Sequence, residues 1–441
     1  MSFDNTIYLG WPISSLRNGR SLVYGQKSRE KVASDKGGLT RAISYNGGGH
    51  LITFAPTLLT YKGATIVIDP KGENFNVTAR RRLELGSKVY VLDPFSIVTP
   101  TQISAQVYGS EERFAFSSAS LNPLDFLIRS SGVSDDAEAQ TIAVSLAERS
   151  GSNALWDNLA TLLLTGMIQF VATSPDVPDS KRSMSTVVKL IFRDNLDDYI
   201  ADITKHKRID RFSRRAFEGF INSGGEKMRG EVISFARSYL TSLTTQSIQN
   251  SIASTTIDLD GLIKGEPITI YIVFPPSKLR AYSKLLRMWV TALMQAIMSR
   301  TSRPELNTLF LLDECAQLGE LEQLRTAVTL LRGYGLQAWM FFQDLSQIEE
   351  RYADWRNLIN NCAVVQAFGL SRQMAAEPIA NLIGGIDSQE LVGLGGSQQL
   401  LAEAGKGTRI AELMTYWRDP VFKGLSDTNP LLRPSEIRQS L

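Results

Sequence analysis

The chain alternates between short apolar runs and longer stretches with helical periodicity. The short runs are rich in β-branched residues and stop at polar or turn residues: His50–Ala55, Gly63–Asp69, Lys88–Asp93, Pro267–Phe274, Leu309–Glu314, Leu336–Phe342 and Ala363–Phe368. Such runs are typical of buried strands in a parallel sheet. Helical patterns follow several of them, as at Asn74–Leu85 and Tyr282–Arg300. This order predicts an α/β fold, with a mostly parallel sheet and helices on both faces.

The middle of the chain has a different pattern. From Leu121 onward strand signals disappear, and helical periodicity covers Asp135–Arg149, Ala154–Ala172, Ser185–Phe192 and Glu226–Ser242. The apolar residues of the second stretch fit one broad helix face: Leu155, Leu159, Leu162, Leu163 and Ile168. We therefore expect an all-helical domain inserted in the α/β domain.

The first part of the chain is polar and punctuated by Gly and Ser. We expect a short strand near Ser21–Tyr24 and otherwise irregular structure up to residue 45. Gly47-Gly48-Gly49 then precedes the apolar run His50–Ala55, which predicts a strand. A phosphate-binding loop follows its strand rather than preceding it, so we interpret the three glycines as a turn.

Composition narrows the classes of function. The 441 residues are 43% hydrophobic and 21% charged, as in an ordinary soluble protein of more than one domain, or of one large core with an insertion. Two cysteines and two histidines exclude a disulfide framework, a zinc site and histidine-based catalysis. We expect neither a secretory signal nor a membrane span, because Leu155–Thr173, the most apolar stretch, contains polar residues and is typical of a buried helix.

Charge gives no bulk argument for nucleic-acid binding, because the net charge is only +2. One local cluster is basic: Lys205, Lys207, Arg208, Arg211, Arg214 and Arg215. A solvated helix face explains such a cluster, and a nucleic-acid contact is the alternative.

Two adjacent carboxylates, Asp313 and Glu314, end the apolar run Leu309–Leu312. Acidic side chains at the carboxyl end of a parallel strand lie in the crevice where open α/β sheets bind ligands. This is the Walker B pattern of a P-loop ATPase, in which the Asp holds Mg²⁺ and the Glu orients the attacking water. The alternative is an acidic helix N-terminus, which the helix dipole favours.

Several motifs then occur in a specific order: Asp69-Pro-Lys-Gly-Glu-Asn74, Val89–Phe95, Leu311–Gly319, Gly333-Tyr-Gly335 and Gln343–Gln347. Their order and spacing resemble those of the TraG/TraD-like coupling proteins of conjugation and type IV secretion, which are RecA-type ATPases of the wider FtsK/HerA group. The resemblance covers roughly residues 45 to 430, with Asn153–Asn158 similar to a Trp-containing segment of the family and Asp419–Leu425 closing it.

The resemblance implies four catalytic or metal-binding roles. Asp313 would hold Mg²⁺, and Glu314 would orient or activate water. Gln343 would sense the γ-phosphate, with a polar cap at the strand end as the alternative. Arg332 would act as an arginine finger across a subunit interface, with a surface salt bridge as the alternative.

The resemblance also implies cofactors, partners and domains. ATP and Mg²⁺ are the cofactors, and Asp69, Lys71 and Glu73 would contribute to their site. The partners would be DNA, bound non-specifically, a relaxase or effector protein, type IV secretion channel components and further copies in a homo-hexamer, in the cytoplasm or peripheral to the bacterial inner membrane. The domains would be an N-terminal extension (1–45), a RecA-like nucleotide-binding domain in two parts (46–120 and 251–441) and the all-helical domain (121–250).

Two family features are missing. We find no N-terminal membrane segment, which fits a soluble variant, a truncated chain or a fragment. We also find no Gly-x-x-x-x-Gly-Lys-Ser/Thr: the expected strands His50–Ala55 and Gly63–Asp69 nearly abut, and Gly405-Lys406-Gly407-Thr408 is interpreted as a plain loop. Seven residues between two parallel strands leave no room for a crossover helix, which needs roughly a dozen or more.

Without the Walker A loop, the phosphates would lose most of their charge stabilisation. Lys62 and Lys71 do not replace its lysine, since neither lies in a Gly-rich loop at a helix N-terminus. Three hypotheses remain: a motor ATPase with impaired nucleotide binding, a non-hydrolysing paralogue or decayed gene product that acts as an adaptor, and a sequence that has lost residues of the complete protein.

Overall fold

The computed structural model describes residues 6–12, 22–25, 40–44, 49–129, 136–147, 153–205, 208–313, 315–319, 331–368, 370 and 372–431. The chain forms two compact units. The sheet unit comprises residues 1–117, 259–276 and 297–441, and the helical unit comprises residues 118–258 and 277–296.

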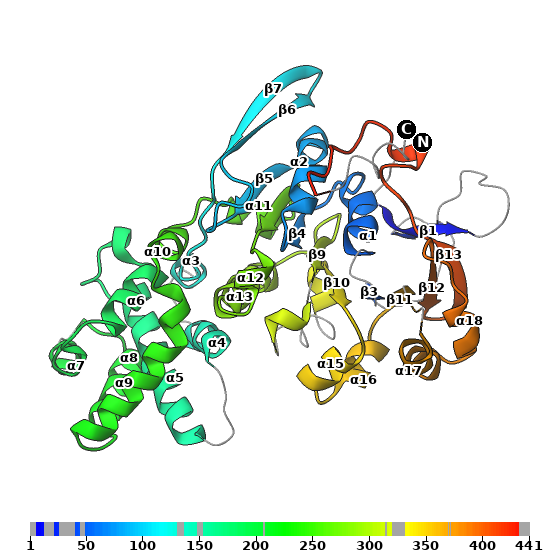
Figure 1. The fold of residues 1–441 in the computed structure, drawn as a ribbon. Coiled ribbons are helices and arrows are strands. Elements are labelled where there is room, and N and C mark those ends of the chain that lie inside the picture. The colour runs from blue at the N-terminus through cyan, green and yellow to red at the C-terminus, as the bar shows by residue number, and fades with distance from the viewer. Residues whose placement is uncertain are drawn as a thin grey trace. The chain divides into compact units, whose positions relative to one another are not determined.

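The sheet unit is built on an 11-stranded sheet of order β2-β1-β13-β12-β11-β3-β10-β9-β4-β8-β5 (Figure 1). The strands are β1 (Thr6–Pro12), β2 (Leu22–Gly25), β3 (Thr40–Ser44), β4 (Thr65–Ile68), β5 (Lys88–Leu92), β8 (Ile268–Ile272), β9 (Thr308–Leu312), β10 (Leu336–Phe342), β11 (Val364–Phe368), β12 (Gln398–Glu403) and β13 (Gly407–Glu412). From β11 to β5 all neighbouring strands pair in parallel, whereas β12, β13, β1 and β2 extend the sheet with antiparallel pairings. The prediction of a mostly parallel α/β sheet is therefore confirmed.

One predicted strand is wrong. Residues 50–55 belong to a helix, α1 (Gly49–Leu58), and the strand that precedes it is β3, in a region expected to be irregular. β3 lies in the middle of the sheet, paired in parallel with both β10 and β11. The length of the apolar run carried the missed signal: it continues for about ten residues to Leu59, longer than the 4–8 residues typical of a buried strand.

Helices α1 and α2 (Glu73–Glu84) cover one face of this sheet and contact each other. Their inward side chains, among them Phe54 and Phe75, join one buried cluster with residues of the strands such as Tyr271, Leu311 and Phe341. The rings of Phe54 and Phe341 pack edge-on with their centroids 4.6 Å apart, and the rings of Phe75 and Tyr271 pack edge-on with their centroids 5.5 Å apart. This packing fixes the direction in which each helix leaves the sheet.

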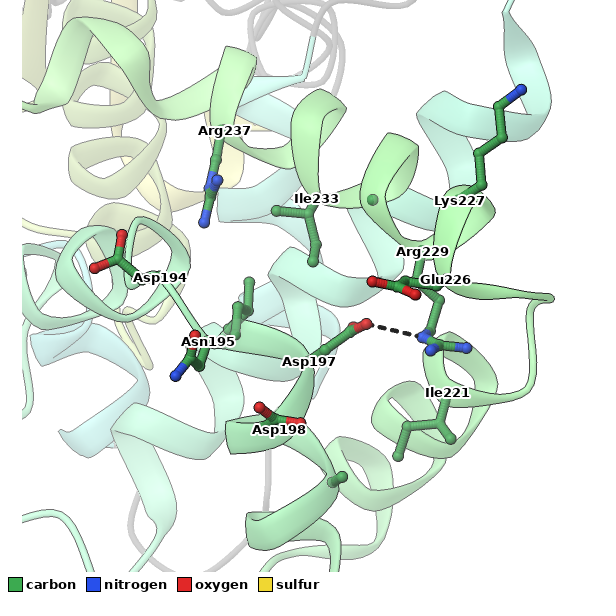
Figure 2. A pocket seen from close by; sticks show the side chains of 13 residues that line it. Asp194, Asn195, Asp197, Asp198, Ile221, Glu226, Lys227, Arg229, Ile233 and Arg237 are labelled. Carbon is green, nitrogen blue, oxygen red and sulfur yellow. Dashed lines mark hydrogen bonds and ion pairs between the residues drawn. The ribbon is translucent and has the colours of Figure 1, made fainter.

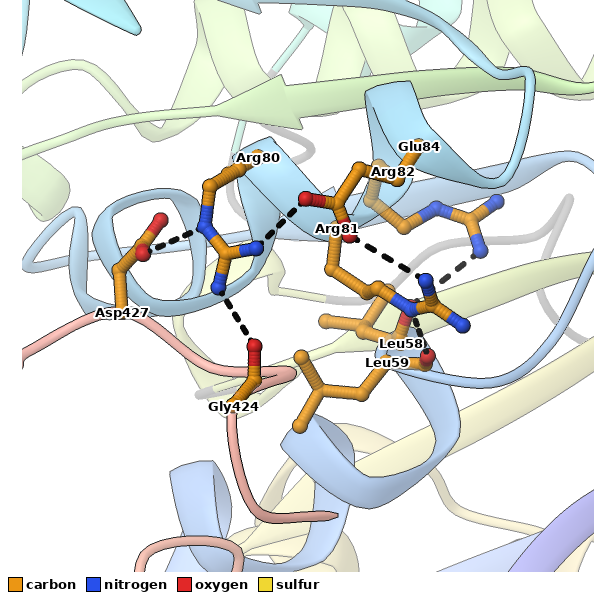
Figure 3. A network of polar contacts seen from close by, with 8 residues as sticks. All are labelled: Leu58, Leu59, Arg80, Arg81, Arg82, Glu84, Gly424 and Asp427. Carbon is orange, nitrogen blue, oxygen red and sulfur yellow. Dashed lines mark hydrogen bonds and ion pairs between the residues drawn. The ribbon is translucent and has the colours of Figure 1, made fainter. Parts of the chain in front are cut away.

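The segment of residues 424–429, near the C-terminus, is hydrogen-bonded to α2 (Figure 3). Arg80 Nε donates to Asp427 Oδ1 at 2.7 Å, and Arg80 Nη2 donates to the Gly424 carbonyl at 3.1 Å. At the other end of the helix, Asn429 Nδ2 donates to Glu73 Oε1 at 2.8 Å. The segment thus runs along α2 and restrains it from outside the sheet.

Two hairpins have no counterpart in the predicted elements. β6 (Thr101–Val107) and β7 (Ser110–Phe116) form a separate two-stranded ribbon that contacts α2 and extends beyond the main sheet (Figure 1). β12 and β13 form the other hairpin, and Gly405 and Gly407 at its turn have φ values of 80° and 79°. Gly405–Thr408 is therefore a hairpin turn, and its interpretation as a loop without phosphate-binding function agrees with this geometry.

The other helices that the structure describes in the sheet unit have between 5 and 11 residues. They are α11 (Leu259–Lys264), α15 (Ser346–Arg351), α16 (Trp355–Asn360), α17 (Gln373–Ile383) and α18 (Ser388–Val392), with 3₁₀ turns η3 (Cys315–Leu318), η4 (Leu331–Tyr334) and η5 (Pro420–Phe422). The predicted helix through Leu321, Leu324 and Val328 lies outside the described residues.

The helical unit contains α3 (Asp125–Arg129), α4 (Asp136–Leu146), α5 (Ala154–Thr173), α6 (Met184–Ile191), α7 (Leu196–Lys205), α8 (Arg211–Ile221), α9 (Glu226–Leu240), α10 (Gln246–Ser251) and most of α12 (Pro276–Leu279) and α13 (Ser283–Met298), with 3₁₀ turns η1 (Asp179–Lys181) and η2 (Thr241–Leu243). The central helix is α5, which packs against α4, α8 and α9. In the described ranges, α5 is the helix that has the length and apolar composition to cross a membrane, and 61% of its apolar window is buried inside the protein.

Candidate functional site

The carboxyl ends of β3, β10, β9 and β4 meet at one edge of the sheet, because these neighbouring strands are parallel. The register places Leu312 opposite both Ile68 and Met340, and Phe342 opposite Ile43. The residues that leave this edge are Ser44, Gln343, Asp313 and Asp69. In open α/β sheets, ligands bind at this edge.

Asp313 is half-buried and follows β9 directly. Glu314, the predicted water-orienting residue, lies outside the described residues. Cys315 is buried and begins η3, so the chain turns away from the sheet just after the two carboxylates. A carboxylate in this place suits Mg²⁺, which protein sites hold through one or two carboxylates and several waters.

Gln343 is exposed and leaves the strand that separates β3 from β9. Its backbone N–H donates to Gln347 Oε1 at 3.0 Å, and Gln347 Nε2 donates to Gln343 Oε1 at 3.4 Å. A ligand spanning the ends of β3 and β9 would pass in front of this amide. Arg332 lies in η4, and its side chain is outside the described part of the structure.

Asp69 leaves the same edge, but its carboxylate points into the first turn of α2. Its Oδ2 accepts from the Phe75 N–H at 2.8 Å, and its Oδ1 accepts from the Asn74 N–H at 3.2 Å. Burial raises the pKa of Asp69 to about 6, although these hydrogen bonds work in the opposite direction. Asp69 thus caps α2 and aligns it with β4.

Lys71 and Glu73 form an ion pair with each other at 3.8 Å. Lys71 is half-exposed, and Glu73 accepts the hydrogen bond from Asn429. The structure thus groups Asp69, Lys71 and Glu73 at the start of α2, and their side-chain hydrogen bonds and ion pair are with one another, with that helix and with the C-terminal segment.

The strand–loop–helix frame of a phosphate site is present in this chain. β3 ends at Ser44, α1 begins at Gly49, and the glycine-rich segment of residues 45–48 connects them. That connecting segment lies outside the described residues. The prediction of a second strand only seven residues before β4 is therefore wrong, because residues 50–55 belong to α1. The short spacing is thus no longer an argument that residues of a crossover helix are missing.

The sequence nevertheless supplies only part of a nucleotide site. The N-terminus of α1 can offer backbone N–H groups to an anion at this edge of the sheet. Ser44 to Leu58 contain no lysine or arginine, however, so the glycine-rich segment has no lysine to neutralise phosphates. Asp313 fits the Mg²⁺ end of ATP–Mg²⁺, and Gln343 leaves the same edge of the sheet, where it would face the γ-phosphate, but the segment that would hold the phosphates has no lysine. Among the described residues, no three His, Cys, Asp or Glu side chains form a metal cluster.

Comparison with known proteins identifies relatives over most of the chain. A family model described as Type IV secretory system Conjugative DNA transfer matches residues 43–390. A conjugal transfer protein TraG from Escherichia coli is 24% identical over 382 residues, which cover 79% of this chain and 57% of the relative. The type IV secretion system-coupling protein VirD4 of Bartonella quintana (strain Toulouse) is 22% identical, with 80% and 56% covered. The chain thus spans a little more than half the length of these relatives.

Solved structures share the fold. The plasmid coupling protein TrwB in complex with ADP and Mg²⁺ superposes with a TM-score of 0.63 at 16% identity, over 86% of each chain. VirB4 of Thermoanaerobacter pseudethanolicus gives a TM-score of 0.55 at 14% identity, over 95% of this chain and 98% of its own. At such identities the likeness shows the fold alone, and that fold is the RecA-like one expected from the motifs.

Proposed function

The chain belongs to the type IV secretory system conjugative DNA transfer family, and from this membership we propose that it is a coupling protein. In this role it recruits DNA, or DNA with a bound relaxase or effector protein, to the channel of a type IV secretion system. The observation that carries the proposal is the extent of the family match, which runs through residues of both the sheet unit and the helical unit. A shared α/β nucleotide fold would account for the first unit only.

The proposal includes an assembly and a place in the cell. The family acts in the type IV secretion system at the cell envelope, and we place this chain at the cytoplasmic face of the bacterial inner membrane. Six copies form a ring, and DNA passes along it without base-specific contacts. Binding through phosphates alone weakens steeply as salt rises, so the affinity for DNA falls between low and high ionic strength.

A motor ATPase is the function that the family implies. The missing lysine between Ser44 and Leu58 favours a second candidate, a subunit that binds ATP–Mg²⁺ weakly and serves as an adaptor. Lysine and metal ions supply most of the charge stabilisation in phosphoryl transfer at P-loops. Because the lysine is absent from this segment, we assign no step of ATP hydrolysis to this chain.

A transfer assay tests the coupling function. Donor cells that lack the gene should transfer DNA or effector protein poorly, and the wild-type gene should restore transfer. Donors that transfer equally well without the gene would overturn the proposal. The Asp313→Ala variant separates the two candidates: an adaptor keeps its transfer frequency, whereas a motor loses it.

A nucleotide titration makes the same distinction in vitro. We expect no saturable binding of a fluorescent ATP analogue at millimolar concentration with Mg²⁺. Saturable binding that disappears in Asp313→Ala would exclude the adaptor and support the motor.

A further inference from the structure

The β1–β2 hairpin forms one end of the 11-stranded sheet and comes from the first 25 residues of the chain. β1 pairs antiparallel with β13 over two residue pairs, one of them Trp11 opposite Glu412. β1 also contacts α1, and its Ile7 and Leu9 are 5% and 3% exposed. The hairpin is thus held on the sheet unit through a short backbone ladder and a small apolar contact.

The sheet presents a prepared surface to this hairpin. Gln399 of β12 is fully buried, and its Nε2 donates to the Leu9 carbonyl at 2.6 Å. Leu401 and Ala411 are also fully buried, and they belong to the same apolar cluster as Ile7 and Leu9. Without a strand beside β13, the amide of Gln399 would lose this hydrogen bond, and an apolar edge would be open to pairing with another chain.

A surface identifies its partner where the structure shows a segment that fits it. The groove between α7 and α9 of the helical unit (Figure 2) is lined by four carboxylates and three cations, so its charge selects no partner. The β13 edge differs from this groove, because the β1–β2 hairpin occupies it. The question at this edge is which copy of the chain supplies the hairpin.

The length of the connection between β2 and β3 bears on that question. The two strands are five intervals apart in the sheet and run in the same direction, so the connection must also return along one strand. With strands about 4.8 Å apart and a rise of about 3.3 Å per residue, the straight path is about 29 Å.

Residues 26–39 provide this connection. Fourteen residues span at most about 46–50 Å. The connection therefore reaches the edge of its own copy, with roughly 17–21 Å in excess of the straight path. The same length serves the β13 edge of a neighbouring copy that lies at a similar distance.

The hairpin and its acceptor edge lie outside the residues that the family model matches, 43–390. β1 and β2 precede this range, and β12 and β13 follow it. Copies in a ring meet through two different surfaces of each chain, since every contact is head-to-tail. A donated hairpin and an acceptor edge make such a pair of surfaces.

We propose that copies of this chain exchange the β1–β2 hairpin, so that the hairpin of one copy pairs with β13 of the next copy in the ring. The partner is a second copy, and the contacts are those that the structure shows within one chain. Exchange of an identical element costs little, because the same contacts form in either arrangement. The proposal rests on the ring assembly of the proposed function and adds a surface that joins neighbouring copies.

Disulfide trapping tests the exchange. Trp11 and Glu412 lie directly opposite each other, which places their Cβ atoms about 4.5–5.5 Å apart, close to the span of a disulfide. Trp11→Cys is made in one copy and Glu412→Cys in a second copy with a different tag, and the two are co-expressed. After oxidation, we expect a disulfide-linked product that carries both tags. With both substitutions in one chain, we expect a ladder of linked species that extends to six chains.

Several controls accompany this experiment. Either single-cysteine variant expressed alone should give no linked product, because the native Cys315 and Cys362 are buried. Pro12→Cys with Ala411→Cys repeats the test at the second residue pair, so a local disturbance at one pair does not decide the result. Circular dichroism confirms that each variant keeps its fold.

Sedimentation velocity of the wild type separates failure of the exchange from failure of the ring. If the copies assemble but both cysteine pairs close only within one chain, the exchange is overturned and the ring stands. A ladder that stops at two chains would also overturn the exchange around a ring, since it would show reciprocal pairing of two copies. A wild type that stays monomeric at every concentration would overturn the ring and the exchange together.

Discussion

The guanidinium group of Arg82 donates a hydrogen bond of 2.8 Å to the carbonyl oxygen of Gly63. Arg82 is fully buried, and it also donates to the carbonyls of Leu58 and Tyr61 and to Thr269 Oγ1. Figure 3 shows the contact with Leu58. One side chain of α2 thus donates hydrogen bonds to a carbonyl at the end of α1, to a carbonyl just before β4 and to a hydroxyl group of β8. Burial lowers the pKa of Arg82 to about 10, so the group stays charged at neutral pH.

Replacing Arg82 by leucine should destabilise the sheet unit by at least about 3 kcal/mol, because several buried carbonyls lose their donor together. Urea unfolding followed by circular dichroism measures the loss. Arg81→Leu is the matched control: Arg81 is partly exposed and donates to the Leu59 carbonyl at 3.2 Å. Its removal should change stability by about 1 kcal/mol. Equal losses in the two variants would show that the buried network does not restrain α1.

The pKa of Asp69 makes stability depend on pH. Burial raises it from 3.8 to about 6, so the folded chain keeps a proton that the unfolded chain has already released. The resulting stabilisation is complete below about pH 4 and is lost as the pH rises through about 6. Relative to Asp69→Asn, which does not titrate, the wild type should lose about 3 kcal/mol of unfolding free energy between about pH 4 and 7. A difference that stays constant over this range would contradict the assignment.

Tyr108 at the tip of the β6–β7 hairpin has a φ of 50°, and Gly109 has a φ of 86°. This pair of positive values suits a two-residue type I′ turn, in which asparagine is favoured and tyrosine is strained. Tyr108 is 96% exposed, so removal of its side chain loses few packing contacts. Tyr108→Asn should stabilise the hairpin by about 0.5–1 kcal/mol. Amide hydrogen exchange in β6 and β7 measures the change, and protection should rise in Tyr108→Asn. Tyr108→Val is the control: a β-branched side chain is more strained at positive φ, so protection should fall.

The β3–α1 frame makes a gain of function testable. Gly49→Lys with His50→Ser would rebuild a Gly-Lys-Ser sequence at the start of α1. We expect ATP–Mg²⁺ to bind at least about tenfold more tightly than to the wild type, and Asp313→Ala to remove the gain. Gln102→Lys adds the same charge at an exposed position of β6, outside the segment between β3 and α1, and should have little effect. If both lysines act alike, the gain reflects general electrostatics.

The sequence predicted most of the strands and the long helices. β4, β5, β8, β9, β10 and β11 lie within one or two residues of the predicted runs, because each is a short apolar run that stops at a polar or turn residue. The edge site was only partly predictable. Asp69 and Asp313 each come directly after an apolar strand. Nothing in the sequence around them tells a helix-capping aspartate from a metal-binding one.

The sequence by itself determined the family, the apolar run Leu309–Leu312 that ends at Asp313 and the absence of a lysine between Ser44 and Leu58, because these depend on residue identity and order. Tertiary structure decided that residues 49–58 form a helix and that β3 is a central strand. An apolar segment buried on all sides has no polar period to distinguish helix from strand. Its state is set by partners far away in the chain: β10 and β11 beside β3, and Trp339 and Phe341 against Phe54.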